Sequence, residues 1–390
     1  MARMLGPKDY GSLQAIISLS VLLGAPLAVI SMLIVKLISS YWGKGEEKKI
    51  AYLLTALTKK SLFLGFIALL FSFLLAPLFA SFLHLKTILP LIIIFVTVFL
   101  GIPLVITRSV LRGTLQFLAL TLNGIIEVYL KLVVATGLVL FNFGLVGAIL
   151  GFPTGALLAY FLTVFSLKNF FKGEKKEEGV FKNLSESFWP ILLATLCFTS
   201  FYSTDLILVR HFFEAQTAGI YAALSVVGKI IIYASGPVVS VMFPLVTVRH
   251  VNGRNYLVPL LGTLVLVLGV ALSLTFLYFL FPKFLVTCLF GERYLAIVPY
   301  LLLFSLFMVF YALNSVFTNF FLSISYYRPF PLLAFAAASQ IFLIYLFHPS
   351  ITAVIYDNIV ASLLYFLICL YYFFKKEGQM VLSTLFRYVR

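Results

Sequence analysis

Residues 132–167 read LVVATGLVLFNFGLVGAILGFPTGALLAYFLTVFSL, a run of 36 residues without one charged side chain. A helix needs about 20 mostly apolar residues to cross a bilayer, so this run is long enough for two spans. The tetrapeptide Phe141-Asn-Phe-Gly144 supplies the turn between them. Strands of a membrane barrel alternate apolar and polar residues over about 10 positions, whereas this run is apolar throughout. The stretch therefore indicates a helical membrane protein.

The composition of the whole chain agrees with this interpretation. Of its 390 residues, 63% are hydrophobic and 11% are charged, and 42 are Phe. Soluble proteins have about 45–50% apolar and about 25% charged residues. This excludes a soluble enzyme, a coiled coil, a disordered chain and a disulfide scaffold. The three cysteines lack metal-ligand spacing and are interpreted as packing residues, so we expect neither a metal nor an organic cofactor.

Charge-poor runs elsewhere extend the pattern to an all-α, polytopic architecture. The first run starts at Gly11 and stays apolar for about 25 residues, which is too long for a cleavable signal peptide. In all, the hydropathy pattern predicts eleven membrane spans, at about 11–38, 61–84, 88–111, 115–141, 144–167, 187–209, 217–246, 256–282, 294–323, 329–347 and 350–374.

The basic residues between the spans predict the orientation in the cell membrane. If successive spans cross the membrane in alternating directions, 19 Lys and Arg lie on the same side as the C-terminus and six lie on the other side. The remaining three lie inside spans. Cytoplasmic loops are enriched in Lys and Arg, so we expect a cytoplasmic C-terminus and an external residue 1. The same rule accounts for the net charge of +15 without a nucleic-acid partner. Because an external, basic N-terminus is unusual, we hypothesise that a first helix is missing from a twelve-span design.

Two halves and a linker are predicted from the longest polar interruption. Residues 1–167 would form an N-terminal lobe of five helices, 168–186 a cytoplasmic linker, and 187–390 a C-terminal lobe of six. Each lobe opens with a basic residue, a polar turn and a glycine, followed by an apolar run that we expect to be broken at Gly24-Ala-Pro26 and at Ser235-Gly-Pro237. Internal repeats with broken helices are typical of transporters, whose substrate site lies between the repeats.

Several motifs resemble one known family. Those that carry the resemblance are Arg3-Met-Leu-Gly-Pro-Lys-Asp-Tyr-Gly11, Thr204-Asp-Leu-Ile-Leu-Val-Arg210, Ala218-Gly-Ile-Tyr221 with its continuation to Lys229, Glu127-Val-Tyr-Leu-Lys131, and Gly144-Leu-Val-Gly147-Ala-Ile-Leu-Gly151. They are similar to polysaccharide flippases of the multidrug/oligosaccharidyl-lipid/polysaccharide (MOP) exporter superfamily. The resemblance implies a twelve-helix fold of two pseudo-symmetric lobes, here without the first helix.

Three ionisable residues lie deep in predicted spans, where a charge costs at least about 2.5–3.5 kcal/mol. Glu127 and Lys131 are four residues apart, so they share one helix face. They form either a structural ion pair or a cavity wall in which Lys131 attracts an anionic substrate and Glu127 is its counter-charge or a proton site. Lys229 has no acidic residue three or four positions away, which favours a role in binding an anion.

Other charged residues are shallower. Lys36, Arg108 and Arg112 lie towards the expected cytoplasmic ends of their spans, where they either line a cavity or extend to the lipid headgroups. The acidic residues Asp205 and Asp357 lie towards the outer side. Asp205 is a candidate partner of Arg210 at an outer rim, and both acids are candidate sites for a coupling ion, H⁺ or Na⁺.

These features favour a secondary transporter that flips a lipid-linked oligosaccharide or polysaccharide precursor. Its diphosphate would need cations at mid-depth, and its partners would be membrane lipids and glycan-synthesis enzymes. A drug or cation antiporter of the same fold remains an alternative, as do a membrane-embedded glycosyl polymerase or ligase and a scaffold without transport activity. The sequence carries no Gly-rich phosphate loop ending in Lys-Ser/Thr, so no ATP hydrolysis is expected.

Overall fold

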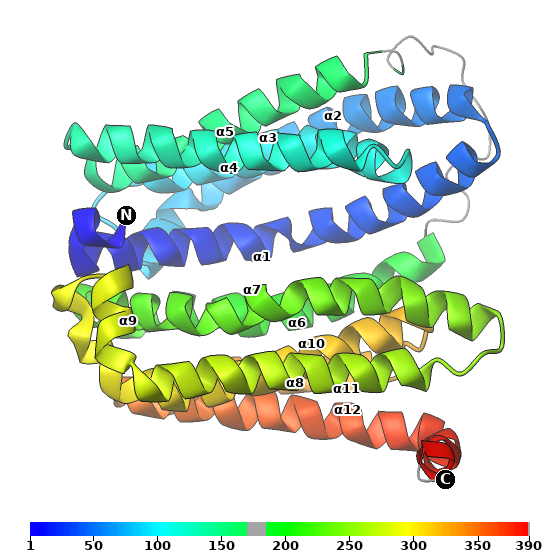
Figure 1. The fold of residues 1–390 in the computed structure, drawn as a ribbon. Coiled ribbons are helices and arrows are strands. Elements are labelled where there is room, and N and C mark those ends of the chain that lie inside the picture. Colours follow the sequence, from blue (N-terminus) through cyan, green and yellow to red (C-terminus); the bar gives the residue numbers. More distant parts are fainter. Residues whose placement is uncertain (169, 171–184, 389–390) are drawn as a thin grey trace. The chain divides into compact units, whose positions relative to one another are not determined.

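The chain folds almost entirely into helices that run roughly parallel or antiparallel to one another within each unit (Figure 1). The computed structural model describes residues 1–168, 170 and 185–388. Two compact units are present, Met1–Thr195 and Leu196–Arg390. The predicted linker 168–186 lies almost wholly outside the described residues.

The elements are α1 (Ala2–Gly43), α2 (Glu47–Phe82), α3 (Leu89–Gly113), α4 (Phe117–Leu140), α5 (Gly144–Ser166), α6 (Ser185–Phe212), α7 (Ala215–Val251), α8 (Leu257–Leu280), α9 (Pro282–Leu289), the 3₁₀-helix η2 (Glu292–Tyr300), α10 (Leu301–Ser323), α11 (Phe330–Leu346) and α12 (Ile351–Tyr388).

Each of the eleven predicted spans overlaps a helix of the described chain, so the all-α prediction is confirmed. Ten helices in the described part of the chain are long and apolar enough to cross a membrane. The eleventh, α11, has 17 residues and is about 26 Å long, which is at the lower limit for a span. The protein is a multi-pass membrane protein.

Three details differ from the sequence-based expectation. Helix α2 begins at Glu47, well before the predicted start near residue 61, because helical structure continues through a lysine-rich turn that lowers hydropathy. The expected breaks at Pro26 and Pro237 are wrong, since α1 and α7 continue through both prolines. A membrane helix tolerates proline because neighbouring groups satisfy the released carbonyl. The loop expected near 282–294 is mostly α9 and η2.

In the first unit, α5 packs closely against α4 through a seam of glycines. Gly147, Gly151 and Gly155 are spaced at four-residue intervals on one face of α5. A Cβ added to Gly151 would lie 2.5 Å from the Lys131 carbonyl oxygen, and one on Gly155 would lie 3.0 Å from the Glu127 carbonyl oxygen. Small residues at this spacing let membrane helices approach to backbone contact. The seam therefore holds the charged turn of α4 directly against α5.

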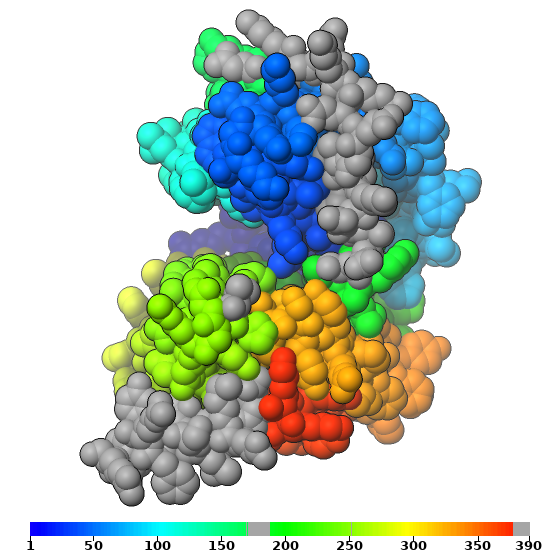
Figure 2. Space-filling view, turned by 90° about the vertical axis from the view of Figure 1, so that its right-hand side faces the viewer, coloured from blue at the N-terminus to red at the C-terminus, as the bar shows by residue number. Residues whose placement is uncertain are grey.

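The second unit is built around α10, which packs against α7, α8 and α12. At the end of this unit seen in Figure 2, the α7–α8 end (yellow-green) lies beside the α10–α11 end (orange). Helix α10 fills the core with fully buried rings, several of them in edge-to-face contact. These rings belong to Phe304, Phe307, Phe317, Phe320 and Phe321.

Candidate functional site

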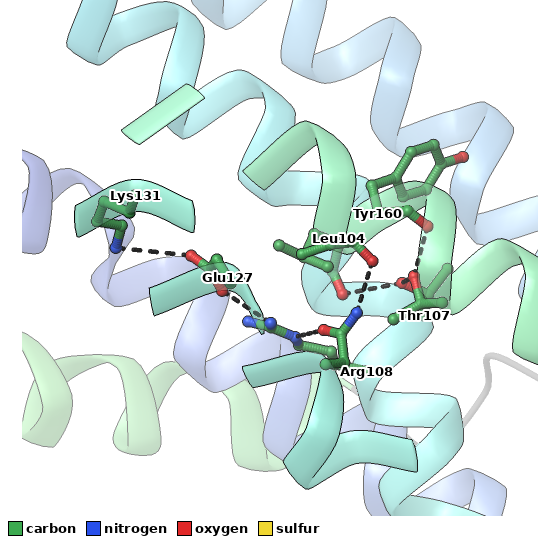
Figure 3. Close-up of polar contacts among 9 residues, drawn as sticks. Leu104, Thr107, Arg108, Glu127, Lys131 and Tyr160 are labelled. Atoms are coloured by element: carbon green, nitrogen blue, oxygen red, sulfur yellow. Dashed lines mark hydrogen bonds and ion pairs between the residues drawn. The ribbon is translucent and has the colours of Figure 1, made fainter. Parts of the chain in front are cut away.

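Three charged side chains form a row across α3 and α4 in the first unit. Arg108 Nη2 lies 2.7 Å from Glu127 Oε2, and Lys131 Nζ lies 3.6 Å from Glu127 Oε1. Figure 3 shows the row, with the carboxylate between the two cations. The helical pair of Glu127 and Lys131 was predicted from their spacing, whereas the link to Arg108 was not.

A second set of hydrogen bonds orients the guanidinium of Arg108. Its Nε donates to Asn123 Oδ1 over 2.7 Å, and Asn123 Nδ2 donates to the Ala159 carbonyl over 2.7 Å. One turn away, the hydroxyls of Thr107 and Thr163 are 2.8 Å apart and join α3 to α5. Asn123 is buried, so its amide is a fixed support between three helices.

The charged row is reachable rather than sealed in the core. The side chains of Arg108, Glu127 and Lys131 are 23%, 16% and 28% exposed. Two cations share one carboxylate, which leaves a net charge of +1. Lys131 also lies 4.7 Å from the centroid of the Phe152 ring. The row can therefore attract an anion while remaining partly neutralised in the apolar unit.

A groove of about 580 Å³ between α1 and α3 meets this row. Its polar wall is formed by Arg108 and Arg112, and its apolar wall comes from α1. At the α1–α3 contact the hydroxyls of Ser31 and Ser109 are 2.8 Å apart. The complete lining is Gly24, Leu27, Ala28, Ser31, Met32, Val35, Val105, Arg108 and Arg112. Cavities of about 300–1,000 Å³ are typical of small-molecule sites.

The three predicted cytoplasmic-side cations differ in their placement. Arg108 and Arg112 lie one helical turn apart on α3 and both line the groove. Lys36 is exposed on α1 and is not part of the groove lining, although its neighbour Val35 is. The structure thus brings Arg108, Arg112, Glu127 and Lys131 into one region of the first unit and leaves Lys36 outside it.

In the second unit, Lys229 lies in the interior of α7. The residue is 5% exposed, and its Nζ lies 4.1 Å from the centroid of the Tyr202 ring. Among the residues that the structure describes, no carboxylate oxygen lies within 4.0 Å of this ammonium group. The charge that acts on it most directly is that of Asp205 on α6.

Asp205 begins a buried chain of hydrogen bonds that the sequence did not reveal. Its Oδ2 accepts from the Tyr221 hydroxyl over 2.8 Å, and that hydroxyl accepts from Asn358 Nδ2 over 3.0 Å. Gln340 Nε2 donates to Asn358 Oδ1 over 2.7 Å and lies 3.3 Å from the Phe201 carbonyl. The chain links α6, α7, α11 and α12 through the core. Two polar amides in otherwise apolar runs were the only sequence signal for it.

The remaining predicted acidic and rim residues are also buried. Asp357 precedes Asn358 on α12 and is 9% exposed, and the imidazole of His348 interacts with it electrostatically. Arg210 is 6% exposed near the end of α6. Within the described residues, Asp205 Oδ1 and Asp357 Oδ2 are buried carboxylate oxygens that accept no hydrogen bond. Such oxygens are where a proton or a small cation would bind.

Comparisons with known proteins place this arrangement in a structural family. The chain is similar to a multidrug resistance MATE family transporter of the MOP superfamily in an inward-facing conformation, with a TM-score of 0.76 and 14% identity over 99% of this chain and 94% of the other. It is also similar to the lipid II flippase MurJ in an inward closed conformation, with a TM-score of 0.71 and 17% identity over 94% of this chain and 81% of the other.

An outward-facing MATE transporter of the MOP superfamily gives a TM-score of 0.61 and 16% identity over 98% of this chain and 89% of the other. No curated protein sequence matches the chain. The fold is thus similar to that of transporters of the MOP superfamily, as the resemblance of the sequence motifs predicted. Residues 1–299 match the family described as polysaccharide biosynthesis protein, and the chain belongs to that family.

Proposed function

We propose that the chain is a secondary transporter that moves a lipid-linked oligosaccharide or polysaccharide precursor across the cell membrane by alternating access. The observation that carries this proposal is the groove between α1 and α3 with its two arginines. Family membership and a fold similar to that of a lipid II flippase support it. The C-terminus would face the cytoplasm, where the glycan-synthesis enzymes would deliver the substrate.

The chemistry of the groove suits the linkage region of such a lipid. A diphosphate presents several anionic oxygens, and planar guanidinium groups bind such oxygens in pairs. The wall opposite the arginines is apolar, so it can contact the first part of a lipid chain. Arg108 and Arg112 would bind the phosphates, and Lys131 would keep the region positive beyond the groove.

The second unit supplies the groups that we assign to ion coupling. We propose that Asp205, with Asp357 nearby, takes up H⁺ or Na⁺ from the gradient. Support comes from their buried oxygens without hydrogen bonds and from the connection of Asp205 to three further helices. Lys229 would respond to this uptake because the charge of Asp205 acts on it. Its ammonium would then become more available to the anionic substrate.

Arg112→Ala is the variant that tests the proposal most directly. Arg112 is exposed and, among the described residues, forms neither an ion pair nor a hydrogen bond, so its removal should not affect folding. In a flippase-deficient strain we expect Arg112→Ala to lower glycan export by about 10-fold or more at normal membrane abundance, as a lost charged hydrogen bond predicts. Lys59→Ala, which removes an exposed cation of α2 outside the groove, should retain export. Full export by the Arg108→Ala/Arg112→Ala double variant would overturn the proposal.

A drug or cation antiporter is the second candidate, because two of the similar structures are multidrug MATE transporters. An organic cation would be repelled by a groove with two guanidinium groups. Export of ethidium by purified protein in proteoliposomes would favour this candidate. Transfer of a fluorescent polyprenyl diphosphate between leaflets of the same vesicles, without ethidium export, would favour the flippase.

A further inference from the structure

One face of α7 carries an unusual set of side chains at the middle of the helix. Lys229, Tyr233, Gly236 and Ser240 follow one another at intervals of three or four residues, so they lie on one stripe. Tyr233 has 18 residues of α7 on either side, which places it about 27 Å from both helix ends. Interfacial aromatic residues lie near the ends of spans, so the position of Tyr233 is not that of an interfacial residue.

The ring of Tyr233 is both exposed and held in place. Its side chain is 62% exposed, and its hydroxyl hydrogen-bonds to the hydroxyl of Tyr202 on α6. The Tyr202 ring in turn lies 6.1 Å from the ring of Tyr311, whose hydroxyl donates to the Phe198 carbonyl over 3.1 Å. An aromatic ring that is fixed before a ligand arrives loses little entropy on binding.

Open space and free acceptor capacity lie beside this ring. A Cβ built on Gly236, one turn along the stripe, would meet no atom within 4 Å. Pro237 has no N–H, so the Tyr233 carbonyl receives no helical hydrogen bond from position 237. The exposed Ser240 hydroxyl donates to the Pro237 carbonyl over 2.7 Å and retains its acceptor capacity. A ligand lying on Tyr233 would therefore meet two oxygen acceptors.

A positive charge lies on the other side of the tyrosine pair. Lys229 is one turn before Tyr233, and its ammonium group is close to the Tyr202 ring. It is 95% buried, and no hydrogen-bond acceptor or carboxylate in the described part of the chain satisfies it. This buried contact supports the Tyr202 ring from the inside and leaves Tyr233, Gly236 and Ser240 as the part of the stripe that a ligand can reach.

The stripe differs from the surfaces of this protein that suit lipid. Helix α4 exposes mainly large apolar side chains, among them Leu118, Val128 and Leu140. The centre of α7 instead exposes a phenol ring, a glycine, a proline and a hydroxyl. Lipid tails offer no partners for the polar groups, whereas a sugar offers both C–H faces and hydroxyls.

We propose that this stripe is a sugar-recognition subsite, in which Tyr233 stacks on a sugar of the substrate. The apolar C–H face of a pyranose lies flat against the negative face of an aromatic ring. Its hydroxyls would donate to the Tyr233 carbonyl and to Ser240. This inference rests on the proposed function and narrows it to the residues that select a glycosylated lipid.

Binding of two defined probes by the full chain in nanodiscs tests this proposal. The first is a polyprenyl diphosphate that carries one N-acetylhexosamine, and the second is the same lipid diphosphate without sugar. We expect the wild type to bind the first more tightly. Tyr233→Ala should lower the affinity for the sugar-bearing probe by about 3- to 10-fold and leave the affinity for the sugar-free probe unchanged. Tyr233→Phe should keep most of the preference because it keeps the ring.

A matched control and distinct outcomes separate this inference from the proposed function. Tyr129→Ala removes a ring of α4 that is 69% exposed, and it should change the binding of neither probe. Equal wild-type affinity for the two probes, or equal weakening of both by Tyr233→Ala, would overturn the sugar subsite and leave the flippase proposal standing. A wild type that binds neither probe would overturn the flippase itself. Tyr233 is mostly exposed, so Tyr233→Ala leaves no internal cavity, and an unchanged melting temperature would verify its fold.

Discussion

Arg108 Nη2 lies 2.7 Å from Glu127 Oε2 and thereby joins α3, which lines the groove, to α4, which does not. The same carboxylate also receives Lys131. Glu127 therefore competes with any anion in the groove for the guanidinium of Arg108. A bound phosphate would therefore replace Glu127 as the anionic partner of Arg108. In the protein without substrate, Glu127 partly neutralises Arg108 and so lowers the free-energy cost of burying this arginine.

We expect a double-mutant cycle to detect this link. Arg108→Ala and Glu127→Ala should each lower the unfolding temperature in detergent. The decrease in the double variant should be smaller than the sum of the two single decreases. The pair is partly exposed, so a coupling energy of about 0.5–1.5 kcal/mol is expected. The corresponding cycle for Lys131→Ala and Glu127→Ala should give a smaller coupling energy, because Lys131 Nζ and Glu127 Oε1 are 3.6 Å apart on one helix. Strict additivity for Arg108 and Glu127 would contradict the structure.

The glycine seam between α4 and α5 should be intolerant of side chains. Gly151→Leu would force α5 away from the Lys131 carbonyl, at a cost of about 1–3 kcal/mol. Membrane abundance and melting temperature should both fall. Gly137→Leu is the matched control, because a Cβ at Gly137 on α4 meets no atom within 4 Å. Equal behaviour of the two variants would disprove close packing at the seam.

The amide of Asn358 should contribute to the stability of the second unit. Asn358→Leu would remove one hydrogen bond from Gln340 and one from Tyr221 in an apolar core, and we expect it to lower the free energy of unfolding by about 1–3 kcal/mol. Ser339→Ala, next to Gln340, removes a hydroxyl that bonds only within its own helix and should cost less than about 0.5 kcal/mol. An unchanged free energy of unfolding in Asn358→Leu would argue against the buried chain of hydrogen bonds.

The alternation of helix ends predicts which turns face the cytoplasm. In a background without the three native cysteines, Lys44→Cys between α1 and α2 should resist a membrane-impermeant maleimide in intact cells. Phe141→Cys, in the turn between α4 and α5 at the opposite end of the first unit, should react. Phe141 is 77% exposed, so access is not limited by packing. The reverse pattern would invert the predicted orientation.

The helices were predictable because each span is a long apolar run whose ends are marked by charge or by a short polar turn. Phe141-Asn-Phe-Gly144 separated α4 from α5 correctly even without a charged residue. Hydropathy failed at the start of α2, where Lys48, Lys49, Lys59 and Lys60 lie in a helix that extends beyond the apolar run. It failed also at Pro26, because tertiary packing decides whether a proline ends a membrane helix.

The candidate sites were predictable only where their members are close in sequence. Glu127 and Lys131 are one turn apart, so their pairing follows from helix geometry. Arg108 and Asn123 lie on different helices, and nothing in the spacing indicates that they meet. The partners of Asp205 are farther still, since Asn358 reaches it through Tyr221 from the last helix of the fold.

The glycine seam also bears on how the chain enters the membrane during synthesis. Helices α4 and α5 are separated by three residues and fit against each other at backbone distance, so they can insert as one hairpin. A carboxylate and an ammonium on the same turn of α4 then enter as a neutralised pair, which reduces the cost of about 2.5–3.5 kcal/mol that each would carry alone. Arg108 precedes them in the chain, so it is synthesised before the carboxylate that it contacts. Glu127 thus enters the membrane with one cation on its own helix and pairs with a second cation from a helix that is made earlier.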